Sequence, residues 1–314
     1  MPTQPDPTAP RPTDRRGPGP ADPGRSDRST DSPSVHEFTA EGPIDLDLQN
    51  LRGGVTVRAE HGTAVTITLT PRDTAARKLI DQVPVRFMND RLIVDVPATQ
   101  EAHLSTGLGD LLRSFGTGEA GASWSDRLAD GVRHLARGAE GLVGELDIDV
   151  VVPAGSRATV STGAGAVRAS GTLARLGLKT GAGDLHLERG ADRSTRLTTG
   201  VGDIVVAGPS AADTSVHTGA GDVTLQRTDG EVEVFTGLGD ITVTCARSGH
   251  LSTRSGMGDI EVRVPSGTAT RLELATGLGD RDVQLTPTDG AGAAERTLEV
   301  DAKTSKGDLR VLRA

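Results

Sequence analysis

The chain has 314 residues, contains 41 glycines and no tyrosine, and has a formal net charge of -9. This acidic balance argues against a nucleic-acid partner, because neutralising phosphates requires clustered Lys and Arg, and the sequence has no such run. Only 2% of the residues are aromatic, so a core must be built from Val, Leu, Ile, Ala and Thr, which suit thin β layers better than a bulky enzyme interior.

Residues 1–35 are rich in Pro, Asp, Arg, Ser and Gly. Such a segment buries too little apolar surface to offset its ordering entropy, so we expect a disordered tail. The sequence shows no apolar core of a signal peptide and no apolar run long enough to span a bilayer. We therefore expect a cytoplasmic protein without a transmembrane segment. An export signal upstream of the given start is the alternative.

Residues 36–97 alternate apolar and polar side chains in short runs such as IDLDL and RLIVDVP, which is typical of β-strands. A short helix is expected near residues 74–80. We expect this part to form the first, atypical β coils or a cap, since terminal repeats of stacked folds deviate in order to seal the core.

Residues 98–144 interrupt the strand pattern and predict an amphipathic helix. Its apolar face includes Trp124, Leu128, Val132 and Leu135, whereas the opposite face carries balanced charge. A membrane-surface helix is normally biased towards Lys and Arg, so we expect this helix to pack over the β region. The alternative is a helix that docks a partner protein or a second copy of the chain.

Residues 145–314 repeat the motif Thr-Gly-apolar-Gly-Asp, each time followed by an alternating strand, as in FTGLGDITV. Most successive copies are 18 or 19 residues apart. A fixed period with two short strands per unit is typical of a solenoid in which each unit forms one coil. We therefore predict an all-β fold, a single-stranded parallel β-helix (β-solenoid) of about 19 residues per coil. The motif aspartates are Asp184, Asp203, Asp222, Asp240, Asp259, Asp280 and Asp308, and Ala166 holds the same place one repeat earlier.

Alternation within each coil predicts which side chains face the core. The Thr of each motif should point inward and bond a neighbouring hydroxyl or a corner carbonyl; these residues include Thr180, Thr199, Thr218 and Thr236. The paired glycines should allow positive φ and close approach of adjacent coils; they include Gly181, Gly183, Gly200, Gly202, Gly219, Gly221, Gly237 and Gly239. The apolar residues between the glycines should fill the corner; they are Ala164, Ala182, Val201, Ala220, Leu238, Met257 and Leu278.

The motif aspartates should face solvent in a ladder along the stack. Carboxylates about 5 Å apart repel by only roughly 0.8 kcal/mol in water, so the ladder needs no metal, and each carboxylate can accept a turn N–H. The alternative is a row of cation sites at Asp184, Asp203, Asp222, Asp240, Asp259 and Asp280, similar to the calcium-binding turns of β-rolls. Calcium is the less favoured hypothesis, because the Asp follows Gly directly, the second half of each coil lacks a matching acidic turn, and the repeat tolerates Ala166 in the same place. No metal or cofactor is assigned.

Patterns that indicate catalysis are weak. The seven histidines show no metal-ligand spacing, and no nucleophile elbow or Cys–His pairing occurs. A carbohydrate lyase or hydrolase on this fold would need an acid–base cluster on one face, and we find no Arg or Lys at offsets that match the carboxylates. Cys245 shares the parity of Ile241 and Val243, so we expect a small buried hydrophobe.

The run VVPAGSRATVSTGAGAVRASG, followed by repeated TGxGD units, resembles the bacterial putative-adhesin family, a domain of unknown function built from β-strand repeats. The resemblance covers about residues 36–314 and implies a parallel β-helix that is usually right-handed. It implies no established activity. The departures from the pattern are the insertion at residues 98–144, Ala166 in place of a motif aspartate, Arg281 at an otherwise apolar inward position, and Ser305 and Lys306 in the last copy. We expect that last copy to be a frayed or capping coil.

These observations favour a non-catalytic scaffold or adhesin-like protein that binds a protein partner or a second copy of itself, and they do not identify the ligand. Two other classes stay open: a carbohydrate-active enzyme of the lyase or hydrolase type, and a calcium-dependent binding module. An acid–base cluster that meets across coils would favour the enzyme. A melting temperature that rises with calcium would favour the module.

Overall fold

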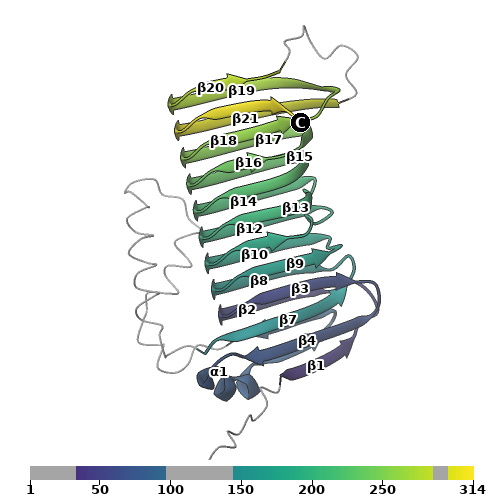
Figure 1. The fold of residues 1–314 in the computed structure, drawn as a ribbon. Helices are drawn as coiled ribbons and strands as arrows, with labels where there is room; N and C mark the ends of the chain where they lie inside the picture. The colour runs from purple at the N-terminus through teal and green to yellow at the C-terminus, as the bar shows by residue number, and fades with distance from the viewer. Residues whose placement is uncertain (1–32, 97–143, 286–295) are drawn as a thin grey trace, which may run out of the picture. The chain divides into compact units, whose positions relative to one another are not determined.

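The computed structural model describes residues 33–96, 144–285 and 296–314, which form strands, one short α-helix and one 3-10 turn. The expected all-β, solenoid-like fold is confirmed (Figure 1). The first strand begins at Ser34, close to the end of the expected tail. The helix expected to carry Trp124, Leu128, Val132 and Leu135 lies outside the described residues.

The strands form two main ladders, here called sheet 1 and sheet 2. Sheet 1 has the spatial order β5 (Val85–Met88), β6 (Arg91–Asp95), β2 (Asp45–Arg52), β8 (Arg157–Ala164), β10 (Arg175–Ala182), β12 (Ser194–Val201), β14 (Asp213–Ala220), β15 (Val223–Leu238), β17 (Ala246–Met257), β21 (Arg296–Lys306) and β19 (Thr268–Leu278).

Sheet 2 contains the strands that follow the motif corners, together with the strands that close one end. Its order is β1 (Ser34–Thr39), β4 (Ala64–Pro71), β7 (Leu146–Pro153), β3 (Val55–Glu60), β9 (Val167–Gly171), β11 (Leu185–Leu187), β13 (Ile204–Pro209), the first part of β15, β16 (Ile241–Val243), β18 (Ile260–Val264), β22 (Leu309–Arg313) and β20 (Arg281–Val283).

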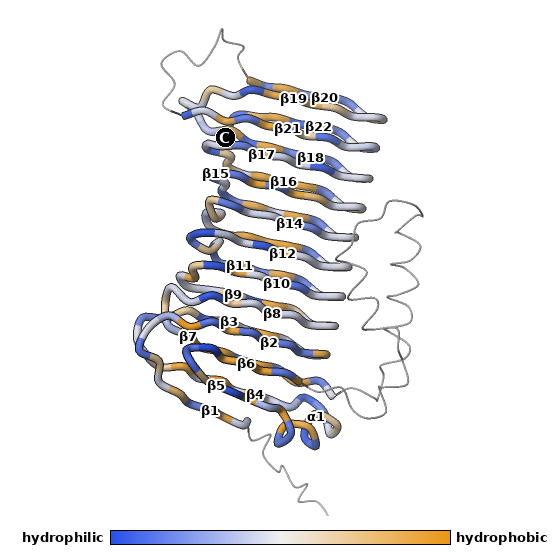
Figure 2. Tube along the Cα trace, turned by 180° about the vertical axis from the view of Figure 1, so that it is seen from behind, coloured by the Kyte–Doolittle hydropathy of each residue, from blue (hydrophilic) through white to orange (hydrophobic). Residues whose placement is uncertain are grey.

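The parallel pairs keep the repeat in register from one level to the next. Thr199 of β12 lies between Thr180 of β10 and Thr218 of β14. Because successive side chains of a strand point to opposite faces, one set of residues is buried in the interior levels. Leu197 and Val216, for example, are fully buried neighbours. The hydropathy colours in Figure 2 show this alternation along the strands, and the small branched residues expected from composition make up the core between the sheets.

Antiparallel strands and a helix close the end of the stack that contains β1 and β5. Strand β4 pairs antiparallel with β1 and β7, and β5 pairs antiparallel with β6. The expected short helix is α1 (Thr74–Leu79), followed by the 3-10 turn η1 (Ile80–Gln82). Asp73 caps α1 by accepting the N–H of Ala76 at 2.7 Å, and its other oxygen accepts the N–H of Glu145 at 3.0 Å.

The order of levels near this end differs from the order of the chain. Strands β2 and β3 lie between the β6–β7 level and the β8–β9 level. Residues 36–97 therefore supply both the closing strands and an interior level. Strands β6 and β7 belong to one level, because they flank β2 and β3 in the same way that β8 and β9 do.

At the other end the last copy of the repeat is not the last level. Strand β21 lies between β17 and β19, and β22 lies between β18 and β20. The expectation of a frayed or capping C-terminal coil is therefore wrong: Val300 and Val311 are buried, at 0% and 1% exposure. The terminal level is β19–β20, where Arg281 stays exposed and an apolar inward residue is not required.

Candidate functional site

The motif corners are built by contact between glycine backbones of adjacent levels. Gly239 has φ +137°, and a Cβ there would lie well inside van der Waals distance of the carbonyl oxygen of Gly221. At the first glycine of the motif the crowding is similar without positive φ: a Cβ on Gly181 would lie 2.6 Å from the carbonyl oxygen of Gly163. The paired glycines are therefore required by close approach at both positions, and by left-handed geometry at the second.

The motif threonines form a buried ladder of hydroxyl–carbonyl hydrogen bonds. The hydroxyl of Thr199 donates to the carbonyl of Gly183 at 3.1 Å, and that of Thr236 donates to Gly221 at 3.1 Å. Thr180, Thr218, Ser255, Thr276 and Thr304 repeat the bond, whereas the buried hydroxyl of Thr162, at the same position on β8, has no hydrogen-bond partner. Of the two partners expected from the sequence, the structure shows the corner carbonyl of the preceding level.

The motif aspartates form a second ladder on the outside of the corner. The amide N–H of Asp222 donates to Oδ1 of Asp203 at 2.8 Å, and Asp222 in turn accepts the N–H of Asp240 at 2.8 Å. The sequence predicted that these carboxylates accept a turn N–H, and the structure assigns the N–H to the next level. The same bond recurs at the other copies, accepted by Asp184, Asp240, Asp259 and Asp308.

This geometry bears on the alternative of a cation row. One oxygen of each accepting aspartate is already bonded to backbone, and within residues 33–96, 144–285 and 296–314 no group of three or more His, Cys, Asp or Glu side chains could hold a metal ion. The carboxylates of Asp184, Asp203, Asp222, Asp240 and Asp259 brace the backbone of the next level, and Asp280 takes part in the ladder by donating its N–H to Asp308. Calcium binding there remains an untested prediction.

Two expectations about apolar side chains are wrong. The residues between the paired glycines do not fill the corner, because their position in the strand points them outward: Leu238, Met257 and Leu278 are 37%, 50% and 69% exposed. Cys245 is only half-buried, since β16 ends at Val243 and the alternation that would bury the thiol stops there.

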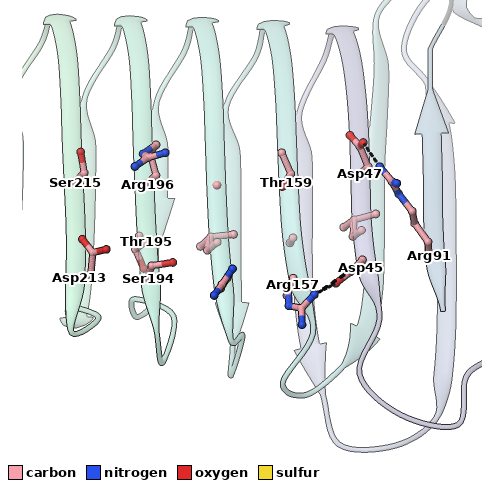
Figure 3. A pocket seen from close by; sticks show the side chains of 15 residues that line it. Asp45, Asp47, Arg91, Arg157, Thr159, Ser194, Thr195, Arg196, Asp213 and Ser215 are labelled. Atoms are coloured by element: carbon pink, nitrogen blue, oxygen red, sulfur yellow. Dashed lines mark hydrogen bonds and ion pairs between the residues drawn. The ribbon is translucent and has the colours of Figure 1, made fainter. Parts of the chain in front are cut away.

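An open groove of about 620 Å³ lies on the outer face of sheet 1 (Figure 3). It crosses β6, β2, β8, β10, β12 and β14 near the ends at which these strands begin. Its lining includes four arginines and three aspartates: Arg91, Arg157, Arg175, Arg196, Asp45, Asp47 and Asp213. Although the whole chain is acidic, this surface has one more positive than negative side chain.

The arginines of the groove differ in their partners. Arg157 pairs with Asp45 at 3.2 Å and Arg91 pairs with Asp47 at 3.2 Å, as the dashed lines in Figure 3 show. Arg175 and Arg196 form no ion pair among the described residues. Guanidinium groups without a carboxylate are suited to binding oxyanions through several N–H donors.

Gly177 leaves a hollow between these two arginines. It lies on β10 two residues after Arg175, and it pairs across the ladder with Arg196 on one side and Thr159 on the other. A Cβ at Gly177 would meet only the Thr159 side chain, at 3.9 Å, and its φ is not positive. Neither packing nor backbone conformation therefore requires glycine here. Because Gly177 has no side chain, the groove is deeper at this point.

The sequence reasoning missed this groove. It found no Arg or Lys at offsets that match the repeat, yet Arg157 and Arg175 are 18 residues apart and lie directly side by side. Counting the outward positions of each coil back from the Thr of the motif would have placed Arg157 and Arg175 in the same row. Arg196 could not be found from that row, because it lies on the neighbouring outward row of β12.

His217 lies on the outer face of sheet 1, on the strand that carries Asp213 and Ser215. Its ring is tilted against Phe235 with 6.1 Å between centroids, and Nδ1 lies 3.3 Å from the hydroxyl of Ser215. Burial lowers the pKa of His217 below its ordinary value. The negative charge of Glu233 acts to raise this pKa, and the positive charge of Arg196 lowers it further.

No helix among the described residues has the length and apolarity needed to cross a membrane. No curated protein matches the sequence. Among solved structures, the chain is similar to a putative adhesin from Bacteroides fragilis, with 12% identity, coverage of 91% of this chain and 98% of that chain, and a TM-score of 0.49.

Two further similar structures are a putative cell adhesion protein from Clostridium sporogenes and a putative lipid binding protein from Parabacteroides distasonis. The first has 10% identity, coverage of 90% and 100%, and a TM-score of 0.29. The second has 11% identity, coverage of 90% and 96%, and a TM-score of 0.34.

The family model described as Toastrack DUF4097 matches residues 47–312, which include the corners, both ladders and every lining residue of the groove except Asp45 and Leu46. This family match confirms the expected resemblance to a bacterial putative-adhesin family of unknown function. The chain belongs to the Toastrack DUF4097 family.

Proposed function

We propose that this protein is a non-catalytic binding scaffold that holds an acidic segment of a partner protein in the groove on the outer face of sheet 1. The observation that carries the proposal is the hollow at Gly177 between Arg175 and Arg196, two arginines without an ion pair among the described residues. Carboxylates of a partner would accept several guanidinium N–H bonds there.

The fold supports this role because it fixes the groove rigidly. The lining side chains project from six strands that are hydrogen-bonded in register, so binding would order few groups and the associated entropy cost would be small. Thr159, Ser194 and Ser215 add hydroxyl groups along the same surface. Asp45 and Asp47 are each paired with an arginine. Such ion pairs suit a binding surface better than a site of proton transfer.

We infer a right-handed, single-stranded β-helix of about 19 residues per coil, because crossover connections between parallel strands of one sheet are overwhelmingly right-handed. The carbohydrate-active enzyme and the calcium-dependent module stay alternatives that no feature of the groove favours. The cytoplasmic location stays a prediction, which cell fractionation checks.

Binding of a fluorescein-labelled oligoglutamate peptide to the full chain, followed by fluorescence anisotropy, tests the groove. We expect the wild type to bind with an affinity that falls as salt is added, and the double variant Arg175→Ser with Arg196→Ser to bind about tenfold more weakly. Arg168→Ser is the matched control, since Arg168 is an exposed arginine of β9 in sheet 2.

Three results would contradict the proposal. They are a wild type that does not bind the acidic peptide, a double variant that binds as well as the wild type, or equal binding of an oligolysine peptide. Circular dichroism of each variant shows whether the fold is intact.

A further inference from the structure

The level formed by β19 and β20 ends the stack with strand edges that have no partner among the described residues. Strand β19 pairs with β21 on one side only, and β20 pairs with β22 on one side only (Figure 1). Strand β19 is 11 residues long, so its outer edge presents a long row of N–H and C=O groups. Such an edge is a ready template for pairing with another strand.

Apolar side chains at this end are left partly uncovered by the described residues. Leu272 and Leu274 face inward but are only half-buried, whereas Val300 and Ala302, their counterparts one level deeper, are 0% and 1% exposed. Burying the two leucines further would stabilise a covered state, because it removes apolar surface from water.

The opposite end of the same stack shows how this fold closes an edge. There the chain adds antiparallel strands, β5 against β6 and β4 against β7, and the rings of Phe38 and Phe87 meet with centroids 5.3 Å apart. Antiparallel addition is thus compatible with the twist and spacing of these sheets. No described strand performs this task at β19.

The outward side chains of β19 form a self-complementary charge pattern. Arg271 and Glu273 lie on either side of Leu272, with side chains 84% and 73% exposed. If a second β19 runs antiparallel with Leu272 opposite Leu272, each Arg271 lies opposite the Glu273 of the other copy. Ala269 then faces Ala275, so neither like charges nor bulky groups meet.

Ion pairs within the chain do not remove this capacity. Arg271 lies 3.8 Å from Glu299, and Glu273 lies 3.4 Å from Lys303, and both pairs are at the surface. Exposed pairs of this kind contribute little and exchange partners readily. A parallel arrangement of the same two edges would instead reverse the faces, so that Leu272 of the two copies would lie on opposite faces of the joined sheet.

We propose that the partner of this end is a second copy of the chain, and that two copies form a two-fold dimer in which β19 pairs antiparallel with β19 about Leu272. The pairing joins sheet 1 of one copy to sheet 1 of the other across the dyad. It is an isologous contact, so it closes at two copies and does not grow. It is independent of the groove and of the function proposed for it.

The test is light scattering with size-exclusion chromatography on the full chain over a range of concentrations. We expect the wild type to form a dimer, and Arg271→Glu and Glu273→Arg each to raise the dimer dissociation constant by about tenfold or more, because each change creates two like-charged pairs. The double variant, Arg271→Glu with Glu273→Arg, restores opposite charges across the dyad and should dimerise again.

The matched control is Arg254→Glu, a charge reversal at another exposed ion pair of sheet 1, which should leave the dimer unchanged. Thermal melts followed by circular dichroism separate loss of pairing from loss of folding. A wild type that is monomeric at every concentration overturns the proposal, which is the result expected if residues 286–295 cover this edge. Filaments that lengthen with concentration, or single variants that dimerise normally, overturn it as well.

Discussion

At the scale of single residues, the aspartate ladder braces the corners through backbone hydrogen bonds. For Asp222→Ala we predict a loss of about 1 kcal/mol in the free energy of unfolding, because the N–H of Asp240 loses its carboxylate acceptor. Asp222→Asn should stay within about 0.5 kcal/mol of the wild type, since an amide oxygen still accepts the bond and one charge leaves the ladder. Urea denaturation measures both variants.

The same variants distinguish bracing from metal binding. If the ladder only braces the corner, calcium and chelator leave the melting temperature of the wild type unchanged. A rise with calcium that is lost in Asp222→Asn would contradict the bracing role and support the cation row.

His217 links stability to pH. Its folded-state pKa is lowered, first of all by burial, so the unfolded chain takes up a proton more readily. The contribution of neutral His217 to the free energy of unfolding is fully present above the unfolded-state pKa of about 6.5. It is lost as pH falls through the folded-state pKa. We predict that urea midpoints between about pH 8 and pH 5 fall less steeply for His217→Gln than for the wild type. Identical slopes would show that another group controls this pH range.

At the scale of structural elements, the glycine corner is the part of each coil that tolerates least change. We predict that Gly239→Ala destabilises the fold by about 2 kcal/mol or more, because the new Cβ meets the carbonyl of Gly221 and φ is positive. Gly177→Ala is the matched control: it lies mid-strand with open space, and it should be neutral or stabilising by about 0.5–1 kcal/mol. Equal melting temperatures of the two variants would contradict this account.

Individual coils were predictable from the sequence because they are governed by local rules. The repeat period identified Thr218 as an inward residue and Asp222 as an outward residue, and a period-2 strand joined to a tight corner leaves little choice. The apolar residue of the motif was misplaced for the opposite reason. Leu238 is hydrophobic yet outward-facing, and the parity of the strand decides its position more strongly than its hydrophobicity does.

At the scale of the whole described stack, the sequence predicted repetition but not the order of the levels. The residues near Leu274 do not indicate whether β19 pairs with β21 or with β17, because every copy of the motif offers an equivalent strand edge. The groove was missed for a related reason. Arg175 and Arg196 meet across two strands and two outward rows, and only a known register brings them together.

The position of β21 between β17 and β19 makes the carboxyl-terminal residues an interior layer. As the chain is synthesised, residues 268–283 leave the ribosome before residues 296–311, the segment against which they finally lie. Residues 268–283 therefore cannot take their final place until residues 296–311 have been made, so the terminal level of the stack stays unpaired during that interval. Removing residues 296–314 would therefore delete an interior level of the stack and leave its terminal level without a neighbour.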